Sequence, residues 1–334
     1  MRRLLTSVFL LAFAIHFAAG SAFAADKLRV GFPSLATALS PPWVAAKKGF
    51  WKKHGLDVEL IFLSGRIIIS SLLGGDLDIV IGSDTSTAIA NIKGANIVRL
   101  GVTTNSLGSS LVSQQHVSSF KQLKDKTIGI GSRGFSSLEL RLSKLLLDNG
   151  LEPDKDVKFF PIGGGPGARV AALKKNLVIA AMITPPYDLV AAESGMKIFA
   201  KIDAPVIAGG VNVNSDYLQG NRDKLVRFLK GYIEGIHFLL TNKEETIKVF
   251  SDYLGNRDAK VLSHFYDEIA GRAEKDLRPD PDSVRFTLDF IGRLYPKAKE
   301  LKVTDYSDLS LLGEIEKSGF IDKLYSGTAG GSAN

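Results

Sequence analysis

The chain contains no cysteine, and this absence excludes several kinds of site at once. Without thiols there can be no disulfide bond, no thiolate metal site and no cysteine nucleophile. Histidine is also scarce, because the 334 residues include only five. Those beyond the N-terminal region are dispersed, at His54, His116, His237 and His264. We therefore expect no metal site, no hydrolytic site and no cofactor.

A second long apolar run and a strong charge of one sign are also missing. After residue 24, no stretch approaches the roughly 20 apolar residues that cross a bilayer. The 42 Lys and Arg exceed the 35 Asp and Glu only modestly, for a formal net charge of +7. Because basic and acidic residues are interspersed, this pattern is typical of a solvated surface, and we expect no nucleic-acid partner.

The first 24 residues have the features of an export signal. Arg2 and Arg3 precede a mainly apolar stretch, and Ala22-Phe23-Ala24 matches an A-x-A cleavage site. The alternative, an uncleaved membrane anchor, needs a longer apolar core. A lipid anchor would need a cysteine at the cleavage site. We therefore expect a soluble, monomeric periplasmic protein that begins at Ala25.

Two stretches of the sequence, about 100 residues apart, share one order of elements. Short strand-like runs at 28–32, 57–62 and 77–82 are matched by runs at 127–131, 156–160 and 177–182, with helical patterns between them. On a constant offset, Gly31 matches Gly131, Leu77 matches Leu177 and Ile79 matches Ile179. Two β-α-β-α-β units predict an α/β fold with two lobes, each a mostly parallel sheet flanked by helices, and a cleft between the lobes.

Helix signals support this division. Pro41-Pro42 is expected to open a helix that ends near Gly49 or Gly55, and Asp84 is expected to cap a helix over 85–93. Ser136 begins a capping box whose helix should stop at Asn149-Gly150. Apolar residues at helical spacing predict further helices near 221–236, 243–254, 258–271, 283–295 and 307–317, which we expect to pack on the first lobe.

These patterns give a domain plan. Residues 1–24 form the signal peptide, 25–110 with 208–325 form the first lobe, 111–207 form the second lobe, and 326–334 form a disordered tail. Two chain crossings, near 110–114 and 204–209, would make a two-strand hinge. Such a hinge permits the lobes to close around a ligand.

Three segments carry a resemblance to a known family. They are the block from Ser40 to Val58 (SPPWVAAKKGFWKKHGLDV), the segment Leu72 to Ile79 (LLGGDLDI), and the segment Phe120 to Ile130 (FKQLKDKTIGI). Together they resemble the solute-binding proteins of ABC importers, in the nitrate/sulfonate/taurine group and its thiamine-pyrimidine-precursor relatives, over about residues 26–215. The resemblance implies a type II-like two-lobed fold with strand order 2-1-3 in each lobe. It also implies a non-enzymatic protein that delivers a small molecule to a permease in the inner membrane.

The sequence departs from this group in two places. Thr184-Pro185-Pro186-Tyr187 replaces the Trp-or-acid pattern of many transport members, and the stretch Gly163 to Gly167 is unusually rich in glycine. Both departures concern the ligand and leave the fold expectation unchanged.

Ligands of open α/β sheets bind beyond the carboxyl ends of the strands, where helix N-termini favour anionic or carbonyl oxygens. This rule selects the loops that follow the predicted strands. The candidate ligand-binding residues are Ser34, Ser40, Trp43, Ser64, Gly65, Arg66, Ser83, Asp84, Thr85, Arg133, Gly134, Phe135, Ser136, Pro185 and Tyr187.

Each candidate also has a structural interpretation. Arg66 and Arg133 could each clamp a carboxylate, sulfonate or phosphate, or could lie in solvent. Asp84 could bind a ligand amine or only cap a helix. The aromatic candidates, Trp43 and Tyr187 among them, could stack on a flat ligand or pack in the core. The arginines favour an organic anion, and the aromatic side chains with Asp84 favour a flat heterocycle or aromatic compound.

Two other functions remain open at this point. The same lobes could serve as a ligand sensor for a signalling kinase, which sequence does not separate from transport. A pyrimidine-synthesis enzyme of the related type depends on a cysteine-rich iron site. Because this chain has no cysteine, the enzyme interpretation is the weaker one.

Overall fold

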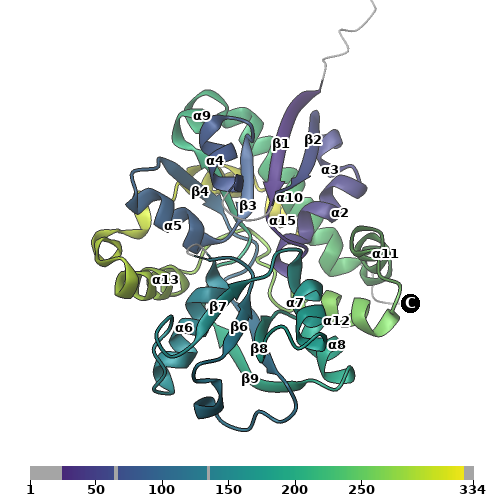
Figure 1. Cartoon of the computed structure of the whole chain (residues 1–334). Helices are drawn as coiled ribbons and strands as arrows, with labels where there is room; N and C mark the ends of the chain where they lie inside the picture. The colour runs from purple at the N-terminus through teal and green to yellow at the C-terminus, as the bar shows by residue number, and fades with distance from the viewer. Residues whose placement is uncertain (1–24, 64–66, 134–135, 327–334) are drawn as a thin grey trace, which may run out of the picture.

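The computed structural model describes residues 25–63, 67–133 and 136–326 (Figure 1). The predicted signal peptide and the tail from residue 327 lie outside the described residues. So do five candidate ligand residues, namely Ser64, Gly65, Arg66, Gly134 and Phe135. In Figure 1 the purple and blue N-terminal strands form an upper α/β body, and the teal strands form a lower one.

The strands of the described chain form two five-stranded sheets, with the orders β2-β1-β3-β10-β4 and β7-β6-β8-β5-β9. The first comprises β2 (Leu56–Phe62), β1 (Asp26–Phe32), β3 (Ile79–Gly82), β10 (Gly210–Asn214) and β4 (Ile97–Gly101). The second comprises β7 (Lys158–Pro161), β6 (Thr127–Ile130), β8 (Ala180–Ile183), β5 (Leu107–Ser113) and β9 (Lys197–Ala204). The predicted α/β fold and its 2-1-3 strand order are confirmed in both sheets.

Each sheet is mixed and not mostly parallel. β1 and β6 each pair in parallel with two neighbours. β10 and β5 each pair antiparallel with both of theirs. The reason is connectivity, since β10 and β5 each enter a sheet from the other sheet and run in the return direction.

The two halves correspond by strand register and not by a constant offset of 100 residues. The pairs Val30–Ile79 and Gly31–Val80 of the first sheet match the pairs Ile128–Ala180 and Gly129–Ala181 of the second. The predicted matches of Gly31 to Gly131 and of Ile79 to Ile179 are therefore wrong. The connecting segments differ in length between the halves, so the offset drifts along the chain.

Packing on the central strands shows why glycine recurs there. A Cβ atom on Gly31 would lie 2.4 Å from Cδ1 of buried Leu77, and one on Gly129 would lie 2.9 Å from Cδ1 of Ile162. Leu177, the predicted match of Leu77, is instead 62% exposed. Glycine thus leaves room for an apolar side chain that lies directly on the strand backbone.

Helices also occupy the first two-thirds of the described chain. They are η1 (Thr37–Leu39), α2 (Pro41–Lys47), α3 (Phe50–Lys53), α4 (Ile67–Gly74), α5 (Asp84–Ile92), η2 (Phe120–Leu123), α6 (Ser137–Asp148), α7 (Gly165–Lys174) and α8 (Tyr187–Glu193). Three of them, α2, α5 and α6, test the predicted signals. The helix opened by Pro41 is confirmed, as is the cap of α6, where Ser136 Oγ accepts from the Glu139 N–H at 3.1 Å. The cap predicted for α5 is wrong, because Ser83 is the N-cap residue and Asp84 is already helical.

The C-terminal part of the chain is helical, as predicted. Its helices are α9 (Ser215–Gly220), α10 (Arg222–Thr241), α11 (Lys243–Leu254), α12 (Ala259–Ala270), α13 (Pro281–Leu294), η3 (Pro296–Glu300), η4 (Val303–Asp305), α14 (Ser310–Lys317) and α15 (Phe320–Ser326). α10 and α14 bury apolar faces against the first sheet. α11 and α12 pack around Trp43 of α2. Ser326, predicted to start the tail, ends α15.

The chain passes between the two sheets through two segments that hydrogen-bond to each other. The Thr103 N–H donates to Gly209 O at 3.1 Å, and Thr104 and Ala208 exchange two backbone bonds of 3.1 and 3.0 Å. The first crossing therefore lies between β4 and β5, at 102–106, earlier than the predicted 110–114. The reason is that β5 already pairs with β8 and β9 of the second sheet. The domain limits drawn from the sequence stay a prediction.

Candidate ligand-binding cleft

A cavity of about 630 Å³ lies where the carboxyl ends of strands from both sheets meet. The first sheet contributes the loops after β1 and β3, and the second contributes the loops after β6, β7 and β8. Leu107, Ala208 and Gly209 at the crossing segments also line it. The cavity thus occupies the position that the sheet rule predicts for a ligand.

The N-terminal turns of four helices border this cavity. They belong to α4, α5, α6 and α7. Ahead of α7, Gly164 has φ 80° and Gly165 has φ 84°, values in the left-handed region that glycine adopts most readily. Converging helix N-termini direct free backbone N–H groups and positive partial charge toward a ligand.

The charged side chains that line the cavity are all basic. Among the described residues that line the cavity, Arg133 and Arg169 are the charged side chains, and there is no Asp, Glu, Lys or His and no aromatic ring. The polar remainder consists of hydroxyl and amide side chains. These are Ser34, Ser70, Ser83, Ser86, Thr87, Ser132, Ser136, Ser137, Thr184 and Asn212. Such a lining suits an anion and offers no carboxylate to a ligand cation.

Arg169 has the most unusual environment of the lining residues. It lies in α7 and is only 4% exposed, and its Nε–H donates to the backbone oxygen of Met182 at 2.6 Å. Burial lowers the pKa of Arg169 to about 10. Among the described residues, no carboxylate forms an ion pair with it. A Cβ atom added to Gly131, which lines the cavity, would lie 3.4 Å from Nη1 of Arg169. The guanidinium therefore lies beside this part of the cavity wall.

Several oxygens in the lining are buried without a hydrogen-bond partner in the described part of the chain. They are Ser83 Oγ, Thr87 Oγ1, Thr184 Oγ1 and Asn212 Oδ1. A buried polar atom without a partner costs free energy, on the order of 1–3 kcal/mol. A molecule bound in the cavity, or ordered water, would supply the missing hydrogen bonds.

Arg133 lines the cavity as the sequence predicts, but its charge is already matched. Its Nη1 and Nη2 donate to the two carboxylate oxygens of Asp154 at 2.7 and 2.8 Å, and Glu139 lies 3.4 Å from its Nε. The hydrogen bond with Asp154 raises the pKa of Arg133. Its guanidinium also lies over the ring of Phe159, 5.2 Å from the centroid. A ligand would have to compete with these partners.

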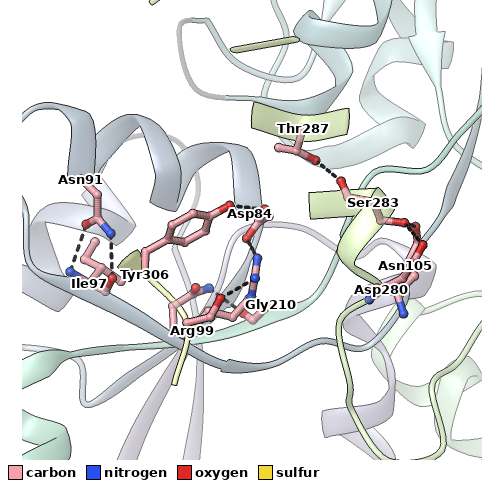
Figure 2. Close-up of polar contacts among 12 residues, drawn as sticks. Asp84, Asn91, Ile97, Arg99, Asn105, Gly210, Asp280, Ser283, Thr287 and Tyr306 are labelled. Atoms are coloured by element: carbon pink, nitrogen blue, oxygen red, sulfur yellow. Dashed lines mark hydrogen bonds and ion pairs between the residues drawn. The ribbon is translucent and has the colours of Figure 1, made fainter. Parts of the chain in front are cut away.

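Asp84 and Thr85 are buried and do not line the cavity. The Asp84 carboxylate accepts a hydrogen bond from Arg99, and both side chains are fully buried (Figure 2). The hydroxyl of Tyr306 lies 3.5 Å from the same carboxylate, and Ser307 accepts from the guanidinium of Arg99. Asp84 therefore ties the start of α5 to β4 and to the C-terminal segment.

Four other candidates also lie apart from the cavity lining. Trp43 is fully buried between Tyr253 and Phe265, with ring centroids 5.0 and 6.1 Å away. Ser40 is buried as well, and its hydroxyl donates to Thr37 O at 2.7 Å. Pro185 and Tyr187 follow β8 without lining the cavity. Tyr187 packs on the backbone of α7, and burial raises its pKa.

Of the described candidates, the structure brings together Ser34, Ser83, Arg133 and Ser136. The sequence analysis missed Arg169, Thr87, Thr184 and Asn212. Arg169 lies one helical turn beyond the Gly163–Gly165 run, so a search for basic residues in the first turns of glycine-initiated helices would have found it. Within the described residues, no cluster of three or more His, Asp or Glu is arranged to hold a metal ion.

A profile of the NMT1/THI5-like family matches residues 37–246, which is more than half of the chain. The protein belongs to this family. Among curated proteins, a Brucella abortus (strain 2308) protein named as a candidate binding protein is 36% identical over 123 residues. That match spans 35% of this chain and 37% of the relative, so it covers about a third of the length of each.

Solved structures share the fold over most of both chains. A Bordetella bronchiseptica RB50 protein has a TM-score of 0.77 at 19% identity, covering 87% of this chain and 98% of that one. The alkanesulfonate-binding protein SsuA of Xanthomonas axonopodis pv. citri, bound to MOPS, has a TM-score of 0.67 at 16% identity, covering 86% and 99%. The fold is thus that of the periplasmic binding proteins of ABC importers.

The same fold also carries catalysis elsewhere. The desulfurization enzyme DSZB has a TM-score of 0.62 at 14% identity and covers 88% of this chain. Fold alone therefore does not separate binding from chemistry.

In the described part of the chain, no helix combines the length and apolar character needed to span a bilayer.

Proposed function

We propose that this protein is the periplasmic solute-binding component of an ABC importer and that its ligand is an organic anion. The observation that carries the anion assignment is Arg169, a buried guanidinium in the cavity wall that no described carboxylate neutralises. An uncompensated buried charge is costly, and an anionic ligand removes that cost. The buried hydroxyls of Thr87 and Thr184 would donate to the same anion.

Two features argue for an organic anion of moderate size. The cavity of about 630 Å³ falls within the range of about 300–1,000 Å³ typical of small-molecule sites, so a bare inorganic anion would leave most of it empty. A flat aromatic ligand has no described ring to stack on, because Trp43 is in the core and Tyr187 is not in the lining. This favours the anion over the heterocycle.

The remaining parts of the proposal come from the family and the sequence. The N-terminal signal supports export to the periplasm, and the importer relatives support delivery to a permease in the inner membrane. The two paired crossing segments support closure of the lobes on the ligand. Catalysis by a thiol is excluded by the absence of cysteine.

The test is a thermal-shift screen of residues 25–334, followed by calorimetric titration of the hits. The panel contains carboxylates, sulfonates, nitrate, pyrimidines and amino acids. A ligand at 100 times its Kd stabilises the folded state by about 2.7 kcal/mol, which gives a measurable rise in Tm. We expect carboxylates or sulfonates to raise Tm and pyrimidines not to. Stabilisation by neutral heterocycles alone would contradict the proposal.

Arg169→Met then tests the anchoring residue. Loss of a hydrogen-bonded charge should weaken anion binding by about 1.5–3 kcal/mol. Arg133→Gln is the matched control, because it removes the other arginine of the same cavity. We expect it to weaken binding less, since Asp154 already occupies that guanidinium. The reverse ranking would assign the anion to Arg133.

A further inference from the structure

A second cavity of about 280 Å³ lies between α6, α13 and the end of β9. α6 packs on the second sheet, whereas α13 packs on α5, which follows β3 of the first sheet (Figure 1). Residues 204–206 of the second crossing segment complete the lining. None of the described residues lines both this cavity and the candidate ligand-binding cleft, so the two are separate sites.

Arg141 of α6 is the residue of this second lining whose bonding is incomplete. It is only 3% exposed, and burial lowers its pKa to about 10. Its Nη1 donates to Leu107 O at 2.7 Å and its Nε–H donates to Ser137 O at 3.2 Å. Its buried Nη2 has no hydrogen-bond partner in the described part of the chain. The fold therefore leaves one donor of a buried cation unmatched.

The carboxylates that line the second cavity do not neutralise Arg141. Asp148 forms an ion pair with Lys144, one turn earlier in α6, and Asp203 forms one with Arg272 at 3.0 Å. The charge of Asp203 offsets only part of the effect of burial on the pKa of Arg141.

Lys201 of β9 adds a second cation to this lining. It is exposed, and among the described residues no carboxylate forms an ion pair with it. Arg141 and Lys201 together give the second cavity two cations without a partner carboxylate. Such a site favours a small anion.

The second cavity also offers aromatic rings, which the described lining of the cleft lacks. Phe286 and Phe290 lie one turn apart on α13, and both line the cavity. The rest of the lining is mostly aliphatic. Because the volume lies just below the range of about 300–1,000 Å³ typical of small-molecule sites, the cavity suits a ligand built on a single ring.

From these observations we infer that the second cavity binds a small aromatic carboxylate, whose oxygens pair with Arg141 and Lys201 and whose ring packs on Phe286 and Phe290. A neutral aromatic compound would leave the buried charge of Arg141 unmatched. A bare inorganic anion would leave the two phenyl rings without a contact. The inference concerns a site apart from the cleft, so it does not depend on the proposed function.

The experiment titrates para-fluorobenzoate into residues 25–334 and follows binding by fluorine NMR. It uses the Arg169→Met variant beside the wild type, because loss of Arg169 weakens anion binding in the cleft and leaves the second cavity intact. We expect the probe to bind the folded Arg169→Met variant. The neutral analogue para-fluorobenzamide should bind about tenfold more weakly or less, as expected when a hydrogen bond to a charged group is lost.

Two substitutions that leave Arg141 in place test the lining, each in the Arg169→Met background. Lys201→Glu should weaken binding of para-fluorobenzoate roughly tenfold, because it replaces an attractive charge with a repulsive one. Phe286→Ala should weaken it roughly fivefold, the scale of an aromatic pair. Lys126→Glu is the matched control, because Lys126 is also exposed, precedes β6 of the same sheet and lines neither cavity. It should leave the affinity unchanged.

The contrary outcomes are distinct. If para-fluorobenzoate binds neither the wild type nor Arg169→Met, water satisfies Arg141 and the inference fails. If it binds the wild type but not the folded Arg169→Met variant, it occupies the cleft, so the inference fails while the proposed function gains support. If para-fluorobenzamide binds as tightly, the cavity does not recognise the anion. Equal losses in Lys201→Glu and Lys126→Glu would show a general effect of charge and would also overturn the inference.

Discussion

Two buried arginines of this chain are in opposite electrostatic situations. Arg99 has a buried carboxylate, Asp84, as its ion-pair partner, and it also donates to Ser307. Its Nε–H alone has no hydrogen-bond partner in the described part of the chain. Arg169 has a backbone carbonyl and no described carboxylate as its partner, and burial lowers its pKa to about 10. Arg99 therefore stabilises the fold through its ion pair, whereas Arg169 lies in the cavity wall, where an anionic ligand could pair with it.

Asp84→Asn tests the structural role of the first pair. It leaves the Arg99 charge buried without a counter-charge, so we expect a loss of about 3–5 kcal/mol in the free energy of unfolding. Chemical denaturation measures this loss. The double variant Asp84→Leu with Arg99→Met, which removes both charges, should recover most of it. Anion affinity of any folded Asp84 variant should stay near wild type, and a specific loss of affinity would return Asp84 to the ligand site.

At the scale of elements, close packing of α10 on α2 and α3 holds the first lobe together. Trp51 of α3 stacks on Phe228 at 5.0 Å between centroids, and its Nε1–H donates to Phe228 O at 2.9 Å. The approach is possible because Gly231 and Gly235 of α10 face the other helices. The sequence pattern predicts α10 as an amphipathic helix but does not reveal which glycines are contacts.

Gly235→Ala should destabilise the protein. Its Cβ would lie 2.8 Å from Ala45 Cβ and 3.1 Å from Ala45 N, and backbone at that distance cannot move aside cheaply. Overpacking of this kind costs about 1–3 kcal/mol, which urea denaturation would show. Gly313→Ala on α14 is the control, because nothing lies within 4 Å of its added Cβ. It should be neutral or stabilising by up to about 1 kcal/mol. Equal effects of the two substitutions would contradict the packing argument.

At the scale of the molecule, the proposed closure on a ligand involves the two sheets, the two crossing segments and the cavity that both sheets line. The crossing segments pair with each other over Thr103–Thr104 and Ala208–Gly209, and in the proposed closure they would bend together. The cavity draws its lining from both lobes, so a ligand that satisfies both stabilises the closed arrangement over the open one.

Closure can be measured directly because the native chain has no cysteine to interfere with labelling. Spin labels on Glu59→Cys of β2 and Lys158→Cys of β7 report the distance between the lobes. Addition of an anion that binds in the calorimetric titration should shift that distance to a shorter and narrower distribution. Labels on Glu59→Cys and Asp216→Cys, both attached to the first sheet, should not respond. Binding without any change between the lobes would rule out closure.

The sequence by itself determined the local elements and their order, because apolar periodicity, helix caps and glycine breaks act over a few residues. It thereby predicted the α/β class, the helical C-terminal region and several of the loops that meet at the cleft, whereas the 2-1-3 strand order came from the resemblance to the family. Only the tertiary structure decided the strand register, the position of the first crossing and which arginine of the cavity lining lacks a carboxylate partner. Arg133 and Arg169 look alike in sequence, and their difference depends on Asp154 and on burial between elements. Those are long-range contacts that residue spacing does not encode.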